Sequence, residues 1–211
     1  TDREAARIEL RARLRLPSDA FLVGGCGTME WRKGADWWAQ LAAQITDERI
    51  HFVWLGGQKN AFSRQVEFDL KKLNLEKRVH FLPPTAHTAP FFAALDAFAL
   101  TSREDPFPLV ALEAAAQLVP VLCFDRAGGA SELVGENAGF VAPYGDVAAM
   151  ARALETWRRE ETLRLSLGET AARKARAMGE VSVGAPRIVA LLERTASQFA
   201  RGAQPPSRRG V

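Results

Sequence analysis

The sequence predicts an α/β fold, a doubly wound parallel sheet with helices on both of its faces. Short apolar runs, which indicate buried strands, alternate with helical patterns along most of the chain. Parallel strands require a crossover between them, usually a helix, so this alternation favours a parallel sheet. Several runs end at glycine or proline pairs, where tight turns are expected. In such Rossmann-like sheets, ligands bind at the carboxyl ends of the strands.

The apolar runs are predicted to be the strands. The first two end in glycine turns, after Cys26 and at Gly56-Gly57, and the third ends at Pro83-Pro84. Because parallel strands point the same way, these turns and the later loops should share one edge of the sheet. The predicted strands are residues 21–26, 50–55, 79–82, 97–101, 120–124 and 139–142.

Helical patterns fill the intervals between these strands. Pro17 ends the first helix, and Asp146 is the expected N-cap of a helix that reaches about Arg159. Residues 202–211 are rich in proline, glycine and arginine and are predicted to be a disordered tail, after a single domain over residues 1–201. The predicted helices are residues 1–16, 35–45, 61–73, 88–94, the Ala/Leu-rich part of 102–117, 131–134, 146–159, 161–178 and 183–200.

The composition is that of a soluble protein with one sizeable core. Of the 211 residues, 47% are hydrophobic and 25% are charged. The net charge of +3 suits an anionic small ligand and is too weak to indicate a nucleic acid partner. Cys26 and Cys123 lie in apolar runs, so we expect free thiols in a reducing, cytoplasmic compartment.

The ends of the chain and its apolar stretches give no sign of export. Thr1 leads straight into an arginine-rich helix, so no signal peptide is expected. The stretch 89–100 is interrupted by Asp96 and is too short for a transmembrane segment. Peripheral membrane association of the full-length protein stays open. The absence of an initial methionine suggests a piece of a longer chain, although processing gives the same result.

The segment 102–117, SREDPFPLVALEAAAQ, carries the densest chemistry. Pro106 and Pro108 suit the first turn of a helix, and the unpaired N–H groups of that turn attract anions. Asp105 should lie at the mouth of this helix and Glu113 about two turns along it, where a carboxylate needs a hydrogen-bond partner. Two acids that bind hydroxyls, next to an anion site, suggest a sugar nucleotide. The alternative is structural, with Asp105 as the N-cap and Glu113 in an ion pair.

A basic loop follows the first strand. Gly25-Cys26-Gly27 resembles the start of a dinucleotide fingerprint, but the third glycine position holds Glu30, which disfavours a nicotinamide or flavin site. Arg32 and Lys33 instead precede a helix that opens at Gly34, and two cations beside a helix N-terminus can hold a diphosphate. The alternative is a solvated pair that caps the loop. Asp36 is expected to be a helix-terminal acid.

Other polar residues give weaker signals. Gly128-Gly129 precede a short helix, and their N–H groups could meet an anion or simply form a tight turn. His87 lies on the ligand edge, and Asp125 is expected to cap its loop. Metal-ligand spacing and an Asp-x-Asp motif are both lacking in the sequence, so no metal is expected. The tryptophans at 31, 37 and 38 are expected to pack in the core or between domains.

Four segments together resemble the C-terminal domain of retaining GT-B glycosyltransferases of family 4, or group 1. They are GTMEWRKGADWW, FVWLGG, LTSREDPFPLVALEAAAQLVPVLCFD and GGASELV, in this order, within about residues 20–158. The family's paired acids fall on Asp105, where the family has glutamate, and on Glu113. Its lysine matches Lys33. Thr28 stands where the family has arginine, so Arg32 would have to supply that charge.

The resemblance implies a nucleotide-sugar-binding domain, the C-terminal half of a GT-B fold. Lys33 and Arg32 would hold the diphosphate, Glu113 the ribose and Asp105 the sugar, and these enzymes stabilise the leaving diphosphate by positive charge and backbone donors. The catalytic residues implied are Lys33, Asp105 and Glu113. The donor-binding residues implied are Arg32, Lys33, Leu82 and Pro83 at the base, Glu104, the N–H groups of Phe107, Pro108 and Leu109, and Glu113.

The resemblance also implies a metal-independent hexosyltransferase of the polysaccharide biosynthesis type, with no cofactor besides the nucleotide diphosphate sugar as donor. Its acceptor would bind mainly to an N-terminal domain that this chain lacks, so the isolated domain should bind donor and catalyse poorly. Two alternatives stay open: a non-catalytic sugar-nucleotide-binding module, and a GT-B-fold sugar-nucleotide epimerase. A generic nucleotide-binding domain ranks third.

Overall fold

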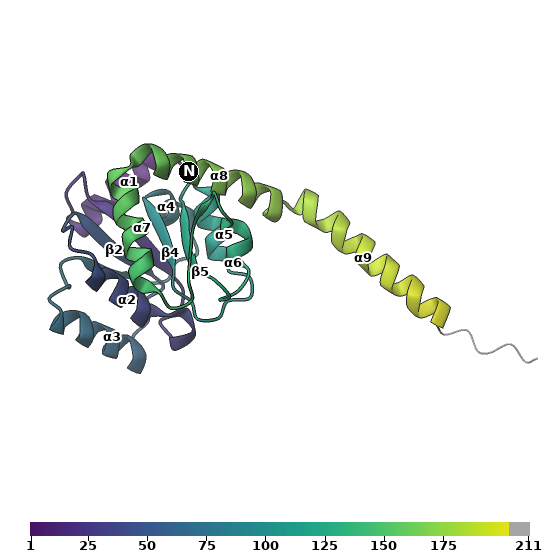
Figure 1. Ribbon diagram of the computed structural model, residues 1–211, viewed down its shortest axis with the longest axis horizontal. Helices are drawn as coiled ribbons and strands as arrows, with labels where there is room; N and C mark the ends of the chain where they lie inside the picture. Colours follow the sequence, from purple (N-terminus) through teal and green to yellow (C-terminus); the bar gives the residue numbers. More distant parts are fainter. Residues whose placement is uncertain (203–211) are drawn as a thin grey trace, which may run out of the picture. The chain divides into compact units, whose positions relative to one another are not determined.

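The computed structural model describes residues 1–202 of the chain (Figure 1). The described residues belong to two compact units, Thr1–Ala175 and the segment that begins at Arg176. The first unit contains the whole sheet. Among the described residues, the second contains helix α9 (Val181–Gly202). Of the predicted tail, Gly202 ends α9, and residues 203–211 lie outside the described residues.

The predicted fold class is confirmed. Six strands form one parallel sheet in the order β3-β2-β1-β4-β5-β6. The chain leaves β1 towards β2 and β3 on one side, and later places β4, β5 and β6 on the other. The carboxyl ends of β1 and β4 therefore flank the point where the strand order reverses, which is where ligands bind in sheets of this kind. The strands are β1 (Phe21–Cys26), β2 (Ile50–Leu55), β3 (Val79–Leu82), β4 (Ala97–Leu100), β5 (Val121–Phe124) and β6 (Gly139–Ala142).

Helices cover both faces of this sheet, as Figure 1 shows. One face packs against α2 (Ala35–Gln44), α3 (Ala61–Lys72) and α7 (Val147–Arg159). The helices on the other face are α1 (Arg3–Leu14), α4 (Ala89–Ala93), α5 (Leu109–Ala116), α6 (Ala130–Val134) and, through Ala171 and Ala175, α8 (Glu161–Gly179). The predicted cap of α7 is confirmed, because the Asp146 carboxylate accepts a hydrogen bond from the N–H of Ala149 (2.8 Å).

Gly25 shows how the sequence shapes the centre of the sheet. A side chain there would collide with the rings of Trp38 and Trp54, which close over β1. These two indoles meet edge to face, with centroids 5.3 Å apart, and Trp38 meets Phe52 in the same way at 5.4 Å. Aromatic pairs of this geometry stabilise a core beyond the area they bury. The absence of a side chain at position 25 therefore allows the largest rings of this face to pack on the central strand.

A buried carboxylate ties the amino ends of the strands together. Asp96 precedes β4, and its side chain is only 2% exposed. It accepts hydrogen bonds from Arg7 (2.8 Å), Arg11 (2.9 Å) and Arg164 (3.0 Å), and from the N–H of Leu22 (2.9 Å). These contacts fasten α1 and α8 to β1 and β4 at the edge opposite the predicted ligand site.

We expect Asp96→Ala to lower the free energy of unfolding by about 3–5 kcal/mol, since it leaves buried guanidinium groups without their partner. Urea denaturation measures this loss. The control is Asp47→Ala, which breaks the exposed Asp47–Arg49 pair (3.0 Å) and should cost no more than about 1 kcal/mol. Equal losses in the two variants would contradict this role for Asp96.

Two histidines stack on adjacent strands, β2 and β3. The rings of His51 and His80 lie 5.7 Å apart, with His80 Nε2 3.5 Å from His51 Nδ1. Burial, and then the neighbouring His51, lowers the pKa of His80 to about 4. Burial, and then the charge of Arg78, also lowers the pKa of His51. Both rings are therefore neutral in the folded protein at pH 7.

We expect this pair to make stability depend on pH. In the unfolded chain His80 takes up a proton near pH 6.5, but in the folded protein it resists protonation until about pH 4. Its contribution is therefore complete above pH 6.5 and is lost as the pH falls towards 4. His80→Gln should lose less stability than the wild type between pH 7 and pH 5 in urea titrations. An identical loss in both proteins would contradict this prediction.

Candidate functional site

The candidate site lies where the strand order reverses, between the loop after β1 and the loop after β4. The first loop contains a short 3-10 turn, Trp31–Lys33, that the sequence did not predict. The left-handed Gly34 (φ 66°) ends this turn and begins α2. The second loop runs from Thr101 to Pro108, the N-cap of α5. The prediction that α2 opens at Gly34, next to the two cations, is confirmed.

Lys33 and Asp105 form the centre of the site. Lys33 Nζ lies 2.6 Å from Asp105 Oδ2, and the two side chains are only 16% and 10% exposed. The hydroxyl of Ser102 lies 3.4 Å from the same oxygen. Asp105 accepts no bond from the first turn of α5, whose N-cap is Pro108, so the alternative that Asp105 caps the helix is wrong. Within residues 1–202, Asp105 instead binds the lysine of the other loop.

Arg32 points to the rim of the same site. Its guanidinium donates to the backbone carbonyl of Glu104 (3.0 Å) and to the carboxylate of Glu30 (3.2 Å), and it lies 4.0 Å from Asp105 Oδ1. The side chain is 44% exposed. Arg32 is therefore within reach of Asp105, but it has more contact with water than Lys33 does.

Helix α5 starts later than its prolines suggested. Its first residue is Leu109, so Pro106 lies outside the helix. Pro108 has no N–H, which corrects the expectation that it donates one. In the part of the chain that the structure describes, the N–H groups of Phe107, Leu109 and Val110 have no backbone or side-chain acceptor. These three donors follow Asp105 closely in the chain, and unpaired N–H groups at the start of a helix can bind an anion.

Glu113 lies one turn into α5 and is exposed to solvent. Its carboxylate accepts a hydrogen bond from the hydroxyl of Thr88 (2.8 Å), the residue before α4. The predicted hydrogen-bond partner is therefore present, while the alternative of an ion pair finds no cation within residues 1–202. Burial, and then the charge of Glu113, raises the pKa of Cys26 to about 11, and Lys33 opposes this shift. The end of β1 thus lies close to both Lys33 and Glu113.

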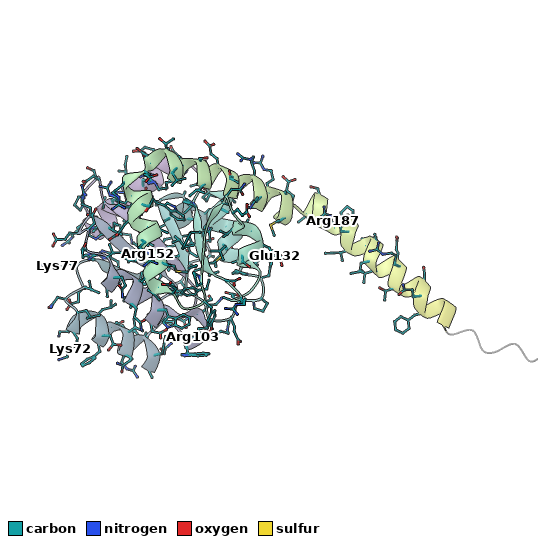
Figure 2. All side chains as sticks on the ribbon, in the orientation of Figure 1. Lys72, Lys77, Arg103, Glu132, Arg152 and Arg187 are labelled. Atoms are coloured by element: carbon teal, nitrogen blue, oxygen red, sulfur yellow. The ribbon has the colours of Figure 1, made fainter. Side chains whose placement is uncertain are left out.

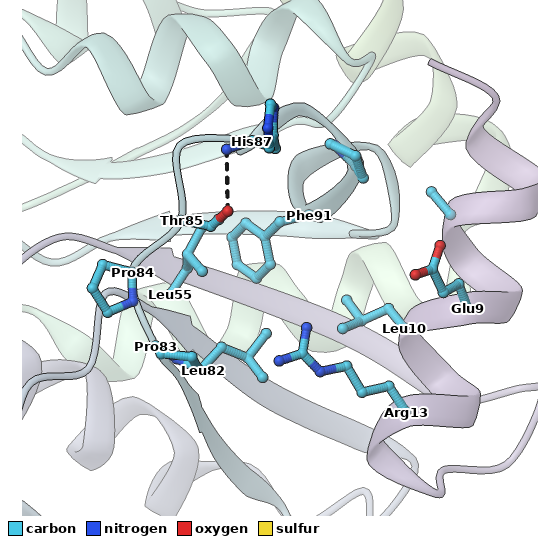
Figure 3. A pocket seen from close by; sticks show the side chains of 12 residues that line it. Glu9, Leu10, Arg13, Leu55, Leu82, Pro83, Pro84, Thr85, His87 and Phe91 are labelled. Carbon is cyan, nitrogen blue, oxygen red and sulfur yellow. Dashed lines mark hydrogen bonds between the residues drawn. The ribbon is translucent and has the colours of Figure 1, made fainter.

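A pocket of about 420 Å³ opens beside the turn that was predicted to carry a base (Figure 3). Leu82 is buried and Pro83 is exposed. The carbonyl of Leu82 already accepts the N–H groups of Gly56 and Gly57 (both 3.0 Å), which fixes the turn. His87 lies on the pocket, and its N–H donates to the Thr85 hydroxyl (3.1 Å). The other lining residues are Ala6, Glu9, Leu10, Arg13, Leu55, Pro84, Pro90 and Phe91.

The Gly128-Gly129 turn has a structural role. Gly128 pairs with Asp105 in an isolated parallel bridge, and the N–H of Asp105 donates to the carbonyl of Ala127 (2.7 Å). The N–H of Gly129 donates to the carbonyl of Pro106 (2.9 Å). The glycine turn therefore supports the Asp105 loop, and the Gly129 amide is already used within the protein.

Sequence reasoning missed Arg103. Its guanidinium binds both carboxylate oxygens of Asp36 (2.8 and 2.7 Å), which gives Asp36 a partner in addition to its place in the first turn of α2. It also lies over the rings of Trp31 and Trp37. Trp38 is in the core as predicted, but Trp31 is 61% exposed and covers Arg103. The only feature of the sequence that pointed to Arg103 was its positive charge beside the acidic residues of the loop.

Residues 1–202 contain neither a cluster of metal ligands nor a membrane-spanning helix. No three or more histidine, cysteine, aspartate or glutamate side chains come together as a metal site would require. None of the helices in this part of the chain is both long and apolar enough to cross a bilayer.

Comparison with known proteins identifies the family. Residues 20–159 match the family model of the group 1 glycosyl transferases. A curated relative, the D-inositol 3-phosphate glycosyltransferase of Kineococcus radiotolerans, is 31% identical over 82% of this chain and 44% of its own length. The chain thus spans less than half the length of that enzyme.

Solved structures agree with this assignment. HepE of Anabaena, in complex with UDP, superposes with a TM-score of 0.83 at 25% identity, over 90% of this chain and 53% of its own. The C-terminal domain of the group 1 glycosyltransferase LpcC of Francisella tularensis has the same fold, with a TM-score of 0.74 at 18% identity over 83% of this chain and 93% of that domain. The chain belongs to the group 1 glycosyltransferases, and it corresponds to the C-terminal half of their GT-B fold.

Proposed function

We propose that this chain is the nucleotide-sugar-binding half of a retaining, metal-independent glycosyltransferase of the hexosyltransferase type. The observation that carries the proposal is the Lys33–Asp105 pair, which joins the loop after β1 to the loop after β4 at the point where the strand order reverses. The unpaired N–H groups of Phe107, Leu109 and Val110 follow Asp105 closely in the chain. A buried cation and a row of backbone donors suit a diphosphate. The similar protein HepE was solved with UDP, which supports a nucleotide as the ligand of this chain.

The donor would lie across the two loops. Its diphosphate would meet Lys33 and the α5 N–H groups, with Arg32 at the rim. Glu113 would accept the ribose hydroxyls, since its carboxylate is exposed and uses one bond to Thr88. The base would lie over the turn at Leu82-Pro83, beside the pocket. In the absence of donor, Asp105 holds Lys33 in place; with donor bound, the Asp105 carboxylate would face the sugar.

The chemistry follows from this charge distribution. Breaking the bond between sugar and diphosphate places negative charge on the leaving phosphate oxygens. Lys33, Arg32 and the α5 N–H groups are already fixed around that position, so they would stabilise the charge as it forms. Positive side chains and backbone donors would thus stabilise the leaving diphosphate, a role that a metal ion has in other enzymes. The sequence has no Asp-x-Asp motif to hold such an ion.

The acceptor would bind to a further domain. The chain spans 44% of the length of the Kineococcus radiotolerans enzyme. We therefore infer that the complete protein has an N-terminal domain, which supplies the acceptor site, and that it is a glycosyltransferase of polysaccharide biosynthesis. We also infer a cytoplasmic protein, which agrees with the free thiols of Cys26 and Cys123. The isolated chain should bind donor and transfer sugar poorly.

The first test is binding. We expect UDP, GDP or ADP to bind the domain in isothermal titration calorimetry, and Lys33→Ala and Glu113→Ala each to weaken that binding about tenfold or more, since hydrogen bonds to charged groups contribute about 1.5–3 kcal/mol. Lys77→Ala and Glu67→Ala, on exposed surface away from the site, are the matched controls. Unchanged affinity in both site variants would refute the assignment of these residues.

The second test is transfer. We expect the full-length protein to transfer a hexose from the nucleotide sugar that binds best, and the anomeric proton in an NMR spectrum to show retained configuration. The isolated chain should release far less product. An inverted product would contradict the proposed mechanism. Conversion of the nucleotide sugar to its epimer without acceptor would favour the epimerase alternative, and tight binding without any reaction would favour a non-catalytic module.

A further inference from the structure

Arg103 is a buried cation that contacts a carboxylate, a backbone carbonyl and two aromatic rings. It lies in the loop after β4, is 7% exposed, and appears at the lower edge of the body in Figure 2. Both of its terminal nitrogens bind Asp36 (2.8 and 2.7 Å), and one also donates to the carbonyl of Trp31 (2.6 Å). The centroids of the Trp37 and Trp31 rings lie 3.9 and 4.6 Å from the guanidinium carbon.

The partners of Arg103 flank Lys33 on both sides. Its backbone N–H donates to the carbonyl of Arg32 (2.8 Å), and its side chain holds the carbonyl of Trp31. On the other side, the hydroxyl of Thr101 donates to the carbonyl of Gly34 (2.9 Å), where a Cβ would collide with the Thr101 carbonyl. The backbone on either side of Lys33 is therefore fixed against the loop after β4.

The chemistry of arginine explains these contacts. A guanidinium is planar and presents paired donors, so it binds a carboxylate with two bonds and stacks on aromatic rings at the same time. Burial alone would raise the pKa of Asp36, but the hydrogen bonds and charge of Arg103 lower it below its usual value. Asp36 is therefore charged at neutral pH. A lysine has the charge but lacks the planar group with paired donors, so it could not make all of these contacts.

We propose that Arg103 is a positioning residue for donor binding: by holding the Trp31–Gly34 backbone against the loop after β4, it keeps Lys33 where the diphosphate binds. Arg103 is buried under Trp31 and reaches Asp36, so it acts through Lys33 and not by touching the donor. This inference rests on the proposed function, since it needs Lys33 to bind the diphosphate.

The experiment compares Arg103→Gln, Arg103→Lys and Asp36→Asn with Arg78→Gln. Arg78 is the matched control because it also joins elements through backbone carbonyls, those of Ile50 (3.2 Å) and Ile45 (2.8 Å), away from the site. For each protein we would measure the unfolding midpoint, the amide hydrogen exchange of residues 28–34 without ligand, and the Kd for UDP, GDP and ADP. Asp36→Asn keeps the shape of the contact and should fold even where Arg103→Gln does not.

We expect Arg103→Gln and Asp36→Asn to speed exchange in residues 28–34 and to weaken nucleotide binding about tenfold, with Arg103→Lys recovering only part of the loss. Arg78→Gln should lower the unfolding midpoint and leave the Kd unchanged. The loss should also vanish in a Lys33→Ala background, because Arg103 would then have nothing to position. A merely structural role would predict the same loss with and without Lys33.

The outcomes separate this inference from the proposed function. A wild type that binds nucleotide, with unchanged binding in Arg103→Gln and Asp36→Asn, would overturn the inference and leave the proposed function standing. An equal loss in the Lys33→Ala background would overturn it too. A wild-type domain that binds none of the three nucleotides would refute the proposed function, and with it any positioning of Lys33 for a donor.

Discussion

The organisation of this domain depends on the attachment of one loop to another. The loop after β1 carries the cations and the loop after β4 leads to the backbone donors of α5, and the two would diverge if nothing joined them, since their strands lead to opposite halves of the sheet. Backbone bonds between Arg103 and Arg32, and between Thr101 and Gly34, hold them together. The Lys33–Asp105 pair then joins two loops whose backbones are already fixed to each other.

The buried ion cluster and the proposed ligand site lie at opposite edges of the sheet. At the amino ends of the strands, Asp96 gathers three arginines around one buried carboxylate. At the carboxyl ends, Arg32 and Glu113 are exposed and have few partners. Arg32 and Glu113 could therefore change partners when a ligand binds, whereas the Lys33–Asp105 pair and the Asp96 cluster are both largely buried. A change of partner at the two exposed groups would leave the core in place.

Much of the fold followed from local sequence signals. The bounds of β1, β2, β3 and β6 agree with the predicted strands, because each is an apolar run with glycine, proline or charge at its ends. Apart from α5, the ends of the helices lie within two residues of the prediction. The prolines of the 102–117 segment suggested an earlier start of α5, but Pro108 is the N-cap, so both prolines precede the helix.

The site could be predicted only in part, and the reason is distance along the chain. Lys33, Asp105 and Glu113 stand out because each lies in a recognisable local pattern. The pair of Arg103 and Asp36 has no such pattern, since its members are 67 residues apart and meet only after β1 and β4 pair. The pocket is another case, because α1 supplies four of its lining residues and nothing local links α1 to the turn after β3. Contacts of this kind join segments that are distant in the chain, so local sequence patterns do not predict them.

The most direct test of this account is a crystal structure of the domain with a nucleoside diphosphate bound. The account predicts phosphate oxygens within hydrogen-bond distance of Lys33 Nζ and of the N–H groups of Leu109 and Val110, a ribose hydroxyl on Glu113, and loops after β1 and β4 that keep their mutual contacts. A diphosphate bound elsewhere, or a bound state in which these two loops have separated, would contradict it.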